Sequence, residues 1–145
     1  MAVSPLVELA RSIATQAHAG QVDKSGNPYI GHPARVAARV LGDDAAEVVA
    51  WLHDVVEDTE VNLDDLHDHF PDLVVDAVDG TSKRPGEPLK DYYARVMAHP
   101  VARTVKLADI ADNTDPNRLA LLDEPTRVRL TAKYAQGRQV LGAAL

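Results

Sequence analysis

Apolar residues recur at steps of three and four along most of this chain, the spacing that places one face of an α-helix in a core. The first such stripe is formed by Leu6, Leu9, Ile13 and Ala17. Equivalent stripes predict helices over residues 5–18, 32–41, 44–56, 63–70, 71–78, 89–98, 101–112 and 125–145. Apolar and polar residues nowhere alternate as they do in a half-buried strand. The fold class predicted is therefore all-α, a compact bundle of several helices.

Glycine, proline and asparagine separate these stripes. Residues 20–31 form an irregular loop, in which Gly26, Asn27 and Pro28 are typical turn formers. A second loop covers residues 80–88, and the Asp-Pro pair at 115–116 ends the helix over 101–112. The sequence contains no internal repeat and no linker-like segment, so we expect residues 1–145 to form a single domain.

Two of the predicted helices carry polar residues at positions where apolar ones would cost less to bury. His53 and Asp54 lie within the helix over 44–56, and Asp109 lies within the helix over 101–112. Such groups must be paired, protonated or bound to a metal when buried. If the central helix continues for one more turn, Glu57 lies below His53 and Asp58 lies below Asp54. That arrangement predicts that His53 and three acids, Asp54, Glu57 and Asp58, lie along one edge of this helix.

Composition narrows the chemistry open to that edge. The chain has no cysteine, so a metal must be held by histidine, aspartate, glutamate or asparagine. Its formal net charge of −7 argues against binding to nucleic acid or to an anionic membrane. No apolar run approaches the ~20 residues of a membrane span, and the first residues lack the features of a signal peptide. We expect a cytoplasmic protein.

Four of the polar residues form a candidate metal site: His32 at the start of a helix, the pair His53 and Asp54, and Asp109. Mixed imidazole and carboxylate ligands suit Mn²⁺, Fe²⁺, Co²⁺ or Zn²⁺ better than Mg²⁺ or Ca²⁺. Four protein ligands leave room on an octahedral ion for water and substrate, as phosphoester hydrolysis requires. For the other histidines the expected role is an ordinary hydrogen-bonded or surface side chain. These are His18, His67, His69 and His99.

Four short motifs occur in a fixed order along the chain. They are Ala-His-Ala-Gly-Gln at 17–21, Gly-Asn-Pro-Tyr-Ile-Gly-His-Pro at 26–33, Leu-His-Asp-Val-Val-Glu-Asp-Thr at 52–59, and Lys-Leu-Ala-Asp at 106–109 with Asn113. On these motifs the sequence resembles the HD-domain metal-dependent phosphohydrolases, and more narrowly the hydrolase domain of RelA/SpoT-type proteins and small alarmone hydrolases. The resemblance runs from the first helix to about Asn113.

The resemblance implies a site and a reaction. Residues matching His32, His53, Asp54 and Asp109 bind one metal in this family, usually Mn²⁺. The substrate is a small nucleotide, guanosine tetra- or pentaphosphate, from which the enzyme removes the 3′-pyrophosphate.

The same match implies roles for residues around the metal. Glu57 and Asp58 would orient or deprotonate the attacking water, and Asn113 would contact substrate near the metal. Glu57 is one helical turn from a ligand, which is close enough to act through water.

Two departures from the family pattern bear on the substrate. Asp23 stands where alarmone hydrolases usually carry an arginine, and an acid there would repel phosphate and offer no guanidinium plane. Asp115 stands in a second segment that is usually basic or polar. The positively charged residues that remain to bind phosphate are Lys24, Lys83, Arg84 and Lys106. Among these, Lys24 and Lys83, together with Asn113, are the predicted substrate contacts.

Three functions therefore remain open. The first is hydrolysis of an alarmone nucleotide, and the second is hydrolysis of another nucleotide or small phosphoester. The third is a nucleotide sensor or partner-binding module that keeps the metal as a structural clip. The sequence leaves the native metal undecided and leaves a homo-oligomer open.

Overall fold

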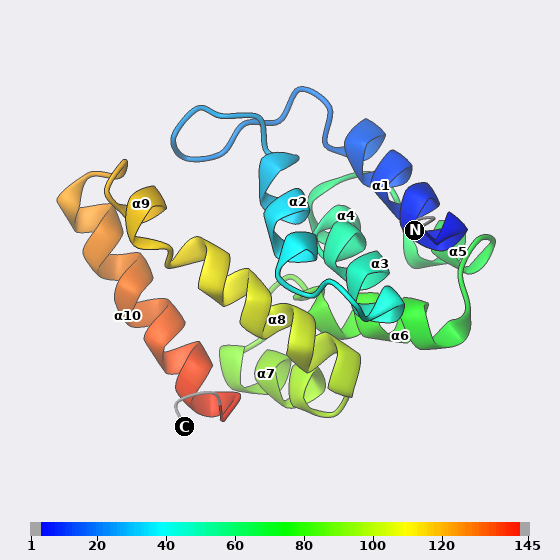
Figure 1. Ribbon diagram of the computed structural model, residues 1–145. Helices are drawn as coiled ribbons and strands as arrows, with labels where there is room; N and C mark the ends of the chain where they lie inside the picture. Colours follow the sequence, from blue (N-terminus) through cyan, green and yellow to red (C-terminus); the bar gives the residue numbers. More distant parts are fainter. Residues whose placement is uncertain (1–3, 143–145) are drawn as a thin grey trace.

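The computed structural model describes residues 4–142, and within that range it confirms the all-α prediction (Figure 1). The only extended pairing in the described residues is an isolated bridge between Val22 and Pro28. The helices are α1 Pro5–Ala17, α2 Gly31–Ala38, α3 Asp44–Leu52, α4 Val55–Asp58, α5 Leu63–His67, α6 Asp72–Thr81, α7 Leu89–Met97, α8 Pro100–Asn113, α9 Pro116–Leu119 and α10 Glu124–Val140. None of these helices is both long and apolar enough to cross a membrane.

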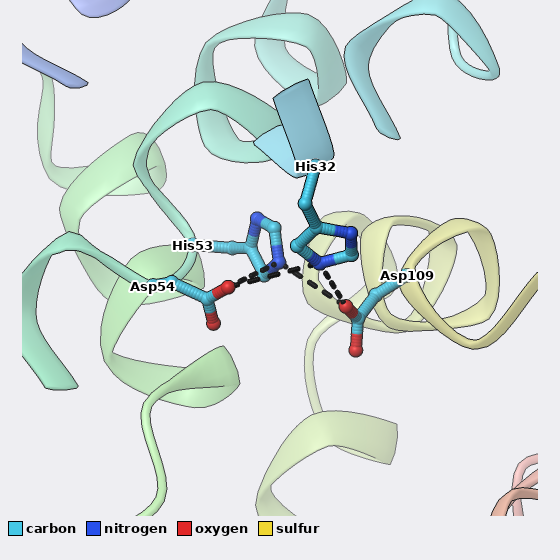
Figure 2. Close-up of side chains that lie close together, drawn as sticks. All are labelled: His32, His53, Asp54 and Asp109. Carbon is cyan, nitrogen blue, oxygen red and sulfur yellow. Dashed lines mark hydrogen bonds and ion pairs between the residues drawn. The ribbon is translucent and has the colours of Figure 1, made fainter. Parts of the chain in front are cut away.

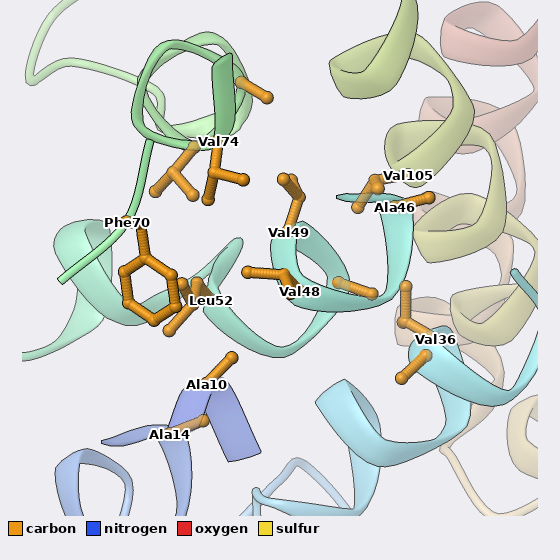
Figure 3. Packing of buried hydrophobic residues seen from close by; sticks show 14 of the residues in the cluster. Ala10, Ala14, Val36, Ala46, Val48, Val49, Leu52, Phe70, Val74 and Val105 are labelled. Atoms are coloured by element: carbon orange, nitrogen blue, oxygen red, sulfur yellow. The ribbon is translucent and has the colours of Figure 1, made fainter. Parts of the chain in front are cut away.

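Helix α3 lies at the centre of the fold and packs against α1, α2, α6 and α8. It can do so because its apolar residues face several directions, as expected of a helix surrounded by protein. Figure 3 shows Val48, Val49 and Leu52 of α3 among side chains from the neighbouring helices, including Val36 of α2 and Val105 of α8. This core fixes α2, α3 and α8 relative to one another.

The prediction of one continuous helix over residues 44–56 is wrong. Helix α3 ends at Leu52, and the single turn α4 begins at Val55. The His53 Nδ1 atom donates to the Ala50 carbonyl at 2.6 Å, and in a continuous helix that carbonyl would accept from the amide of Asp54. Asp54 then adopts φ −104° and ψ −3°, outside the usual helical range. Glu57 and Asp58 therefore lie on a short turn of their own.

Other boundaries differ from prediction for local reasons. Helix α5 stops at His67, earlier than predicted, and begins with a capping box formed by Asn62 and Asp65. The Asp-Pro pair at 115–116 ends α8 as predicted but also starts α9, because Asp115 caps the amide of Asn117. The last predicted helix runs unbroken through Gly137 to Val140, and its final three positions, 143–145, lie outside the described residues.

A second apolar cluster holds α10 against α7 and α8. It consists of Tyr92, Tyr93, Val96, Ile110 and Leu141. Gly137 makes this packing possible, since a Cβ at that position would lie 2.5 Å from the Tyr93 hydroxyl oxygen. The close approach allows α10 to pack against both α7 and α8.

Candidate active site

The four residues of the predicted metal set lie together. His32 comes from the first turn of α2, His53 and Asp54 from the break between α3 and α4, and Asp109 from the middle of α8. One ligand atom from each lies within 4.8 Å of the others. Figure 2 shows the two imidazoles directed toward the two carboxylates. The structure therefore brings together the residues that sequence spacing alone left unconnected.

The distances within this cluster fit a single metal ion. His53 Nε2 lies 3.2 Å from Asp54 Oδ2 and 3.3 Å from Asp109 Oδ1. His32 Nε2 lies 2.7 Å from Asp109 Oδ1 and 3.7 Å from Asp54 Oδ2. Neighbouring ligand atoms on an octahedral ion are separated by about 3.0 Å when the bonds are about 2.1 Å long. The cluster thus needs only small adjustments to enclose a first-row divalent metal.

A hydrogen bond on the side of each imidazole away from the cluster determines which ring nitrogen faces the cluster. His32 Nδ1 lies 2.7 Å from Asp112 Oδ2, and His53 Nδ1 donates to the Ala50 carbonyl. Because these partners accept hydrogen bonds, Nδ1 carries the proton in both rings, and the lone pair of a neutral ring is on Nε2. In a neutral ring each Nε2 faces a carboxylate oxygen, acceptor against acceptor, whereas in a protonated ring Nε2 donates to that oxygen. Either a proton on Nε2 or a metal cation between the atoms resolves the conflict, so the donor set fits a divalent metal.

Both carboxylates of the cluster are held by further contacts. Asp54 Oδ2 accepts a hydrogen bond from the Tyr29 hydroxyl. Asp109 Oδ2 accepts from Lys106 Nζ at 2.9 Å, and its Oδ1 accepts from Asn113 Nδ2 at 3.1 Å. Burial by itself would raise the pKa of Asp109, but the adjacent Lys106 ammonium and the two imidazoles hold that pKa well below its usual range. Asp109 is therefore ionised and able to bind a cation.

Asp112 is a functional candidate that sequence reasoning missed. Its side chain is only 1% exposed, and it accepts from Arg35 Nε at 2.9 Å and Arg118 Nη1 at 2.8 Å in addition to His32. A carboxylate behind a metal-binding histidine orients the ring and makes it more basic. A signal was present, because Asp112 follows Asp109 by three positions on a helix and so shares its face.

A cavity of about 450 Å³ opens beside the cluster. That volume is in the range of small-molecule sites. The cavity is lined by all the predicted catalytic and substrate-contact residues, which are Lys24, Glu57, Asp58, Lys83 and Asn113. It is also lined by residues from the C-terminal part of the chain that the sequence did not single out as a group, which are Arg118, Arg129, Lys133 and Tyr134.

The acidic pair lies next to the metal cluster. One oxygen each from Glu57, Asp58 and Asp54 lie within 4.8 Å of one another. Glu57 Oε1 accepts from the backbone N–H of Lys83 at 2.5 Å, which fixes its direction. Burial raises the pKa of Glu57, the Lys83 N–H opposes this rise, and the charges of Asp54 and Asp58 add to it. A carboxylate with a raised pKa is a better proton acceptor.

Asp23, which the sequence led us to expect to repel phosphate, is occupied by contacts of its own. Its Oδ1 accepts from the backbone amides of Ser25 at 2.9 Å and Asn27 at 3.0 Å, which organises the loop. Its Oδ2 lies 3.7 Å from Arg118 Nη2. The second departure, Asp115, caps α9 and lies 3.5 Å from Arg39. Both acids therefore have cationic partners, and their repulsion of phosphate is reduced.

Comparison with known proteins decides the family. Residues 10–86, more than half of the chain, match the HD domain. The chain belongs to the HD-domain family. The matched segment contains His32, His53 and Asp54, and the structure adds Asp109 from α8.

Relatives of this HD domain confirm its resemblance to RelA/SpoT-type proteins. It is 40% identical over 119 residues to the GTP pyrophosphokinase of Streptomyces coelicolor, an alignment that covers 74% of this chain and 14% of that protein. It is 35% identical over 132 residues to the guanosine-3′,5′-bis(diphosphate) 3′-pyrophosphohydrolase of Haemophilus influenzae, covering 83% of this chain and 20% of that protein. The chain thus spans one fifth or less of the length of these two curated relatives.

A solved structure confirms the fold over nearly the whole chain. It is described as a metazoan ortholog of SpoT that hydrolyses ppGpp and plays a role in starvation responses. The TM-score is 0.80 at 21% sequence identity, and the match covers 97% of this chain and 88% of the other. The helical arrangement that surrounds the cluster is therefore shared with that protein.

Proposed function

We propose that this HD domain is a Mn²⁺-dependent phosphohydrolase that removes the 3′-pyrophosphate from guanosine tetra- or pentaphosphate or a related alarmone nucleotide. The observation that carries the proposal is the convergence of two imidazoles and two carboxylates beside a cavity with its own acidic pair. The Haemophilus relative, named for this reaction, and the metazoan SpoT ortholog, described as hydrolysing ppGpp, support it.

The relatives' names describe both the making and the removal of a pyrophosphate group. The hydrolytic direction is favoured here because Glu57 and Asp58 lie beside the metal cluster, where they can act on a water molecule. Hydrolysis needs such a base, and it needs only one nucleotide in the cavity.

The ligands in this proposal are His32 Nε2, His53 Nε2, Asp54 Oδ2 and Asp109 Oδ1. Two nitrogen and two oxygen donors suit Mn²⁺, and other divalent transition metals fit the same set. When bound, the ion would lower the pKa of a coordinated water and neutralise charge on phosphate oxygens. Asp112 and the Ala50 carbonyl keep both imidazoles in the tautomer that such binding requires.

Glu57 is the proposed proton acceptor. The Lys83 N–H holds one of its oxygens, and the other is available to a water near Asp54. The raised pKa of Glu57 brings its basicity closer to neutral pH, where a general base works best. Asp58, whose pKa burial and the charge of Asp54 also raise, is proposed to orient the same water.

Lys24, Lys83 and Asn113 are the proposed substrate contacts. Lys24 and Lys83 belong to loops on the rim of the cavity, where an ammonium group can reach phosphate. Asn113 donates to Asp109 Oδ1 and to the Tyr134 hydroxyl at 3.3 Å, so its amide is fixed next to the metal cluster. Arg129 and Lys133 of α10 line the same cavity and add positive charge to it.

The test begins with purified protein stripped of metal with a chelator. With Mn²⁺ restored, we expect release of pyrophosphate from guanosine tetraphosphate. Asp54→Ala should abolish both metal binding and turnover, whereas Glu57→Ala should abolish turnover and leave Mn²⁺ bound in calorimetry. Glu60→Ala is the matched control, because Glu60 is an exposed acid outside the cavity. Full activity in Glu57→Ala would show that the water is activated elsewhere.

A second candidate is hydrolysis of a different nucleotide or small phosphoester. The observation favouring it is Asp23, because a carboxylate hydrogen-bonded to its own loop and lying beside Arg118 cannot stack on a base as an arginine would. A panel of nucleotides with a phosphate-release assay separates the candidates. A substrate that exceeds guanosine tetraphosphate in kcat/KM would replace the first proposal with the second.

A further inference from the structure

The proposed water-activating residues lie on a very short element. Helix α4 contains only the four residues Val55–Asp58, and it follows a break in the chain. A single helical turn has little stability of its own, because forming it fixes several dihedral angles for one hydrogen bond. Glu57 and Asp58 therefore need support from outside α4 to stay beside the metal cluster.

Besides the Lys83 N–H that holds Glu57, support for α4 comes from both ends of the loop between α1 and α2. At one end of α4, Asp54 Oδ2 accepts from the Tyr29 hydroxyl. At the other end, the Asp58 carbonyl accepts from Gln21 Nε2 at 3.0 Å. The Tyr29 amide also donates to the Gln21 carbonyl at 2.9 Å, so the two supporting residues are joined through their backbones. Two residues distant in sequence thus hold the start and the end of α4.

His18 fixes the direction of both supporting side chains. It is 1% exposed, and its Nδ1 lies 2.8 Å from Gln21 Oε1. Because the Gln21 amide nitrogen already donates to Asp58, its oxygen must accept, and His18 Nδ1 is the donor. The His18 ring packs against the ring of Tyr29, with centroids 4.9 Å apart. We call His18, Gln21 and Tyr29 the α4 brace.

We propose that Tyr29 and Gln21 are positioning residues for the reaction, with separable roles. Tyr29 orients the carboxylate of Asp54 toward the metal. Gln21 holds the end of α4, so that Asp58 and Glu57 stay in reach of the attacking water. The part of this inference that concerns turnover rests on the proposed function, and the part that concerns metal binding and the order of α4 does not.

Tyr29→Phe tests the first role, since it removes the hydroxyl and keeps the ring that packs on His18 and His32. Contacts of this kind, behind a metal ligand, change metal affinity by about 10- to 100-fold. We expect the Kd of the chelator-stripped protein for Mn²⁺, measured by calorimetry, to rise by about tenfold. Raising the Mn²⁺ concentration should then restore most of kcat.

Gln21→Met tests the second role, because methionine has a similar length and makes neither hydrogen bond. We expect the Kd for Mn²⁺ to stay within about twofold of wild type, while kcat at saturating Mn²⁺ falls by about tenfold or more. Amide hydrogen exchange in residues 55–59 should become faster in the metal-loaded protein. Gln16→Met is the matched control, since Gln16 is exposed on α1 and does not line the cavity.

Three results would overturn the assignment. One is Mn²⁺ binding by Tyr29→Phe that equals wild type. Another is a Gln21→Met variant whose exchange at 55–59 is unchanged. The third is a parallel loss of melting temperature, metal affinity and kcat in both variants, which would indicate a merely structural role. If wild type binds Mn²⁺ but hydrolyses none of the nucleotides, the proposed function fails. The metal-affinity and hydrogen-exchange measurements still show whether the α4 brace supports Asp54 and α4.

Discussion

Replacing Asp112 by asparagine would test whether the carboxylate behind His32 supports metal binding. Asp112 accepts three hydrogen bonds, from His32 Nδ1 at 2.7 Å, Arg118 Nη1 at 2.8 Å and Arg35 Nε at 2.9 Å. Asparagine has one acceptor oxygen and one NH₂ group. If its oxygen faces His32 and Arg118, its NH₂ faces Arg35, donor against donor. The shape of the side chain is kept while the negative charge and one bond are lost.

The expected magnitudes follow from these contacts. A hydrogen bond to a charged group contributes about 1.5–3 kcal/mol, and the bond to Arg35 falls at the low end because that side chain is 42% exposed. Loss of the buried charge also weakens the other two bonds, so we expect the metal-free protein to lose about 2–4 kcal/mol of unfolding free energy. A neutral acceptor makes the His32 ring less basic, and we expect Mn²⁺ affinity to fall by about 10- to 100-fold.

Two measurements on chelator-stripped protein check this prediction: urea unfolding for stability and calorimetric titration with Mn²⁺ for affinity. Asp115→Asn is the control, because it makes the same chemical change three residues away. Asp115 contacts Arg39 at 3.5 Å on the surface, and asparagine caps α9 equally well, so its effect should stay within about 0.5 kcal/mol. Mn²⁺ binding by Asp112→Asn within twofold of wild type would refute the reasoning.

Three further predictions concern stability. Gly137→Ala should lower the unfolding free energy, measured in urea, by about 1 kcal/mol. Overpacking against Tyr93 costs about 1–3 kcal/mol, and the higher helix propensity of alanine offsets only about 1 kcal/mol of that cost. A more stable variant would contradict the packing. The Arg95 hydrogen bonds lower the pKa of Glu87 from 4.5 to about 2, so this ion pair stabilises the fold above pH 4.5 and its contribution is lost as the pH falls toward 2. Glu87→Gln should therefore reduce the dependence of the unfolding free energy on pH over that window, measured by acid titration followed by circular dichroism. An unchanged pH dependence would argue against the ion pair. Mn²⁺ at about 100 times its Kd should raise the unfolding free energy by about 2.7 kcal/mol, and equal thermal melts with metal and with chelator would exclude a specific site.

The periodicity of apolar residues was sufficient to predict most of the helices, but it did not predict the break at His53. The apolar stripe over residues 44–56 continues across that point, since Val55 remains buried in the same core as Leu52. Helix α3 ends where the His53 side chain donates a hydrogen bond to the Ala50 carbonyl, in place of a backbone amide. Such competition leaves no trace in the spacing of apolar residues. Glu57 and Asp58 therefore lie next to Asp54 on a different element from the one predicted, and their role stays a prediction.

The candidate ligands could be predicted because they lie in local motifs, whereas their supporting contacts could not. The contacts of His32 with Asp112 and of Tyr29 with Asp54 join residues 80 and 25 positions apart. Only the packing of α2 against α8, and of the loop between α1 and α2 beside Asp54, determines such pairs. Asp23 shows the same limit, because its sequence position suggests an acid that repels phosphate and its carboxylate is occupied by the loop and Arg118.

Charge in the cavity reconciles an acidic chain with the phosphate-rich substrate that we propose. Six cationic side chains line it, and they are Lys24, Lys83, Lys106, Arg118, Arg129 and Lys133. Five acids line it as well, and they are Asp23, Asp54, Glu57, Asp58 and Asp109. One divalent ion would change the balance of these groups from +1 to +3. The net charge of −7 is therefore carried elsewhere on the protein, and a bound metal would make the cavity attractive to the proposed nucleotide, which the rest of the surface would repel.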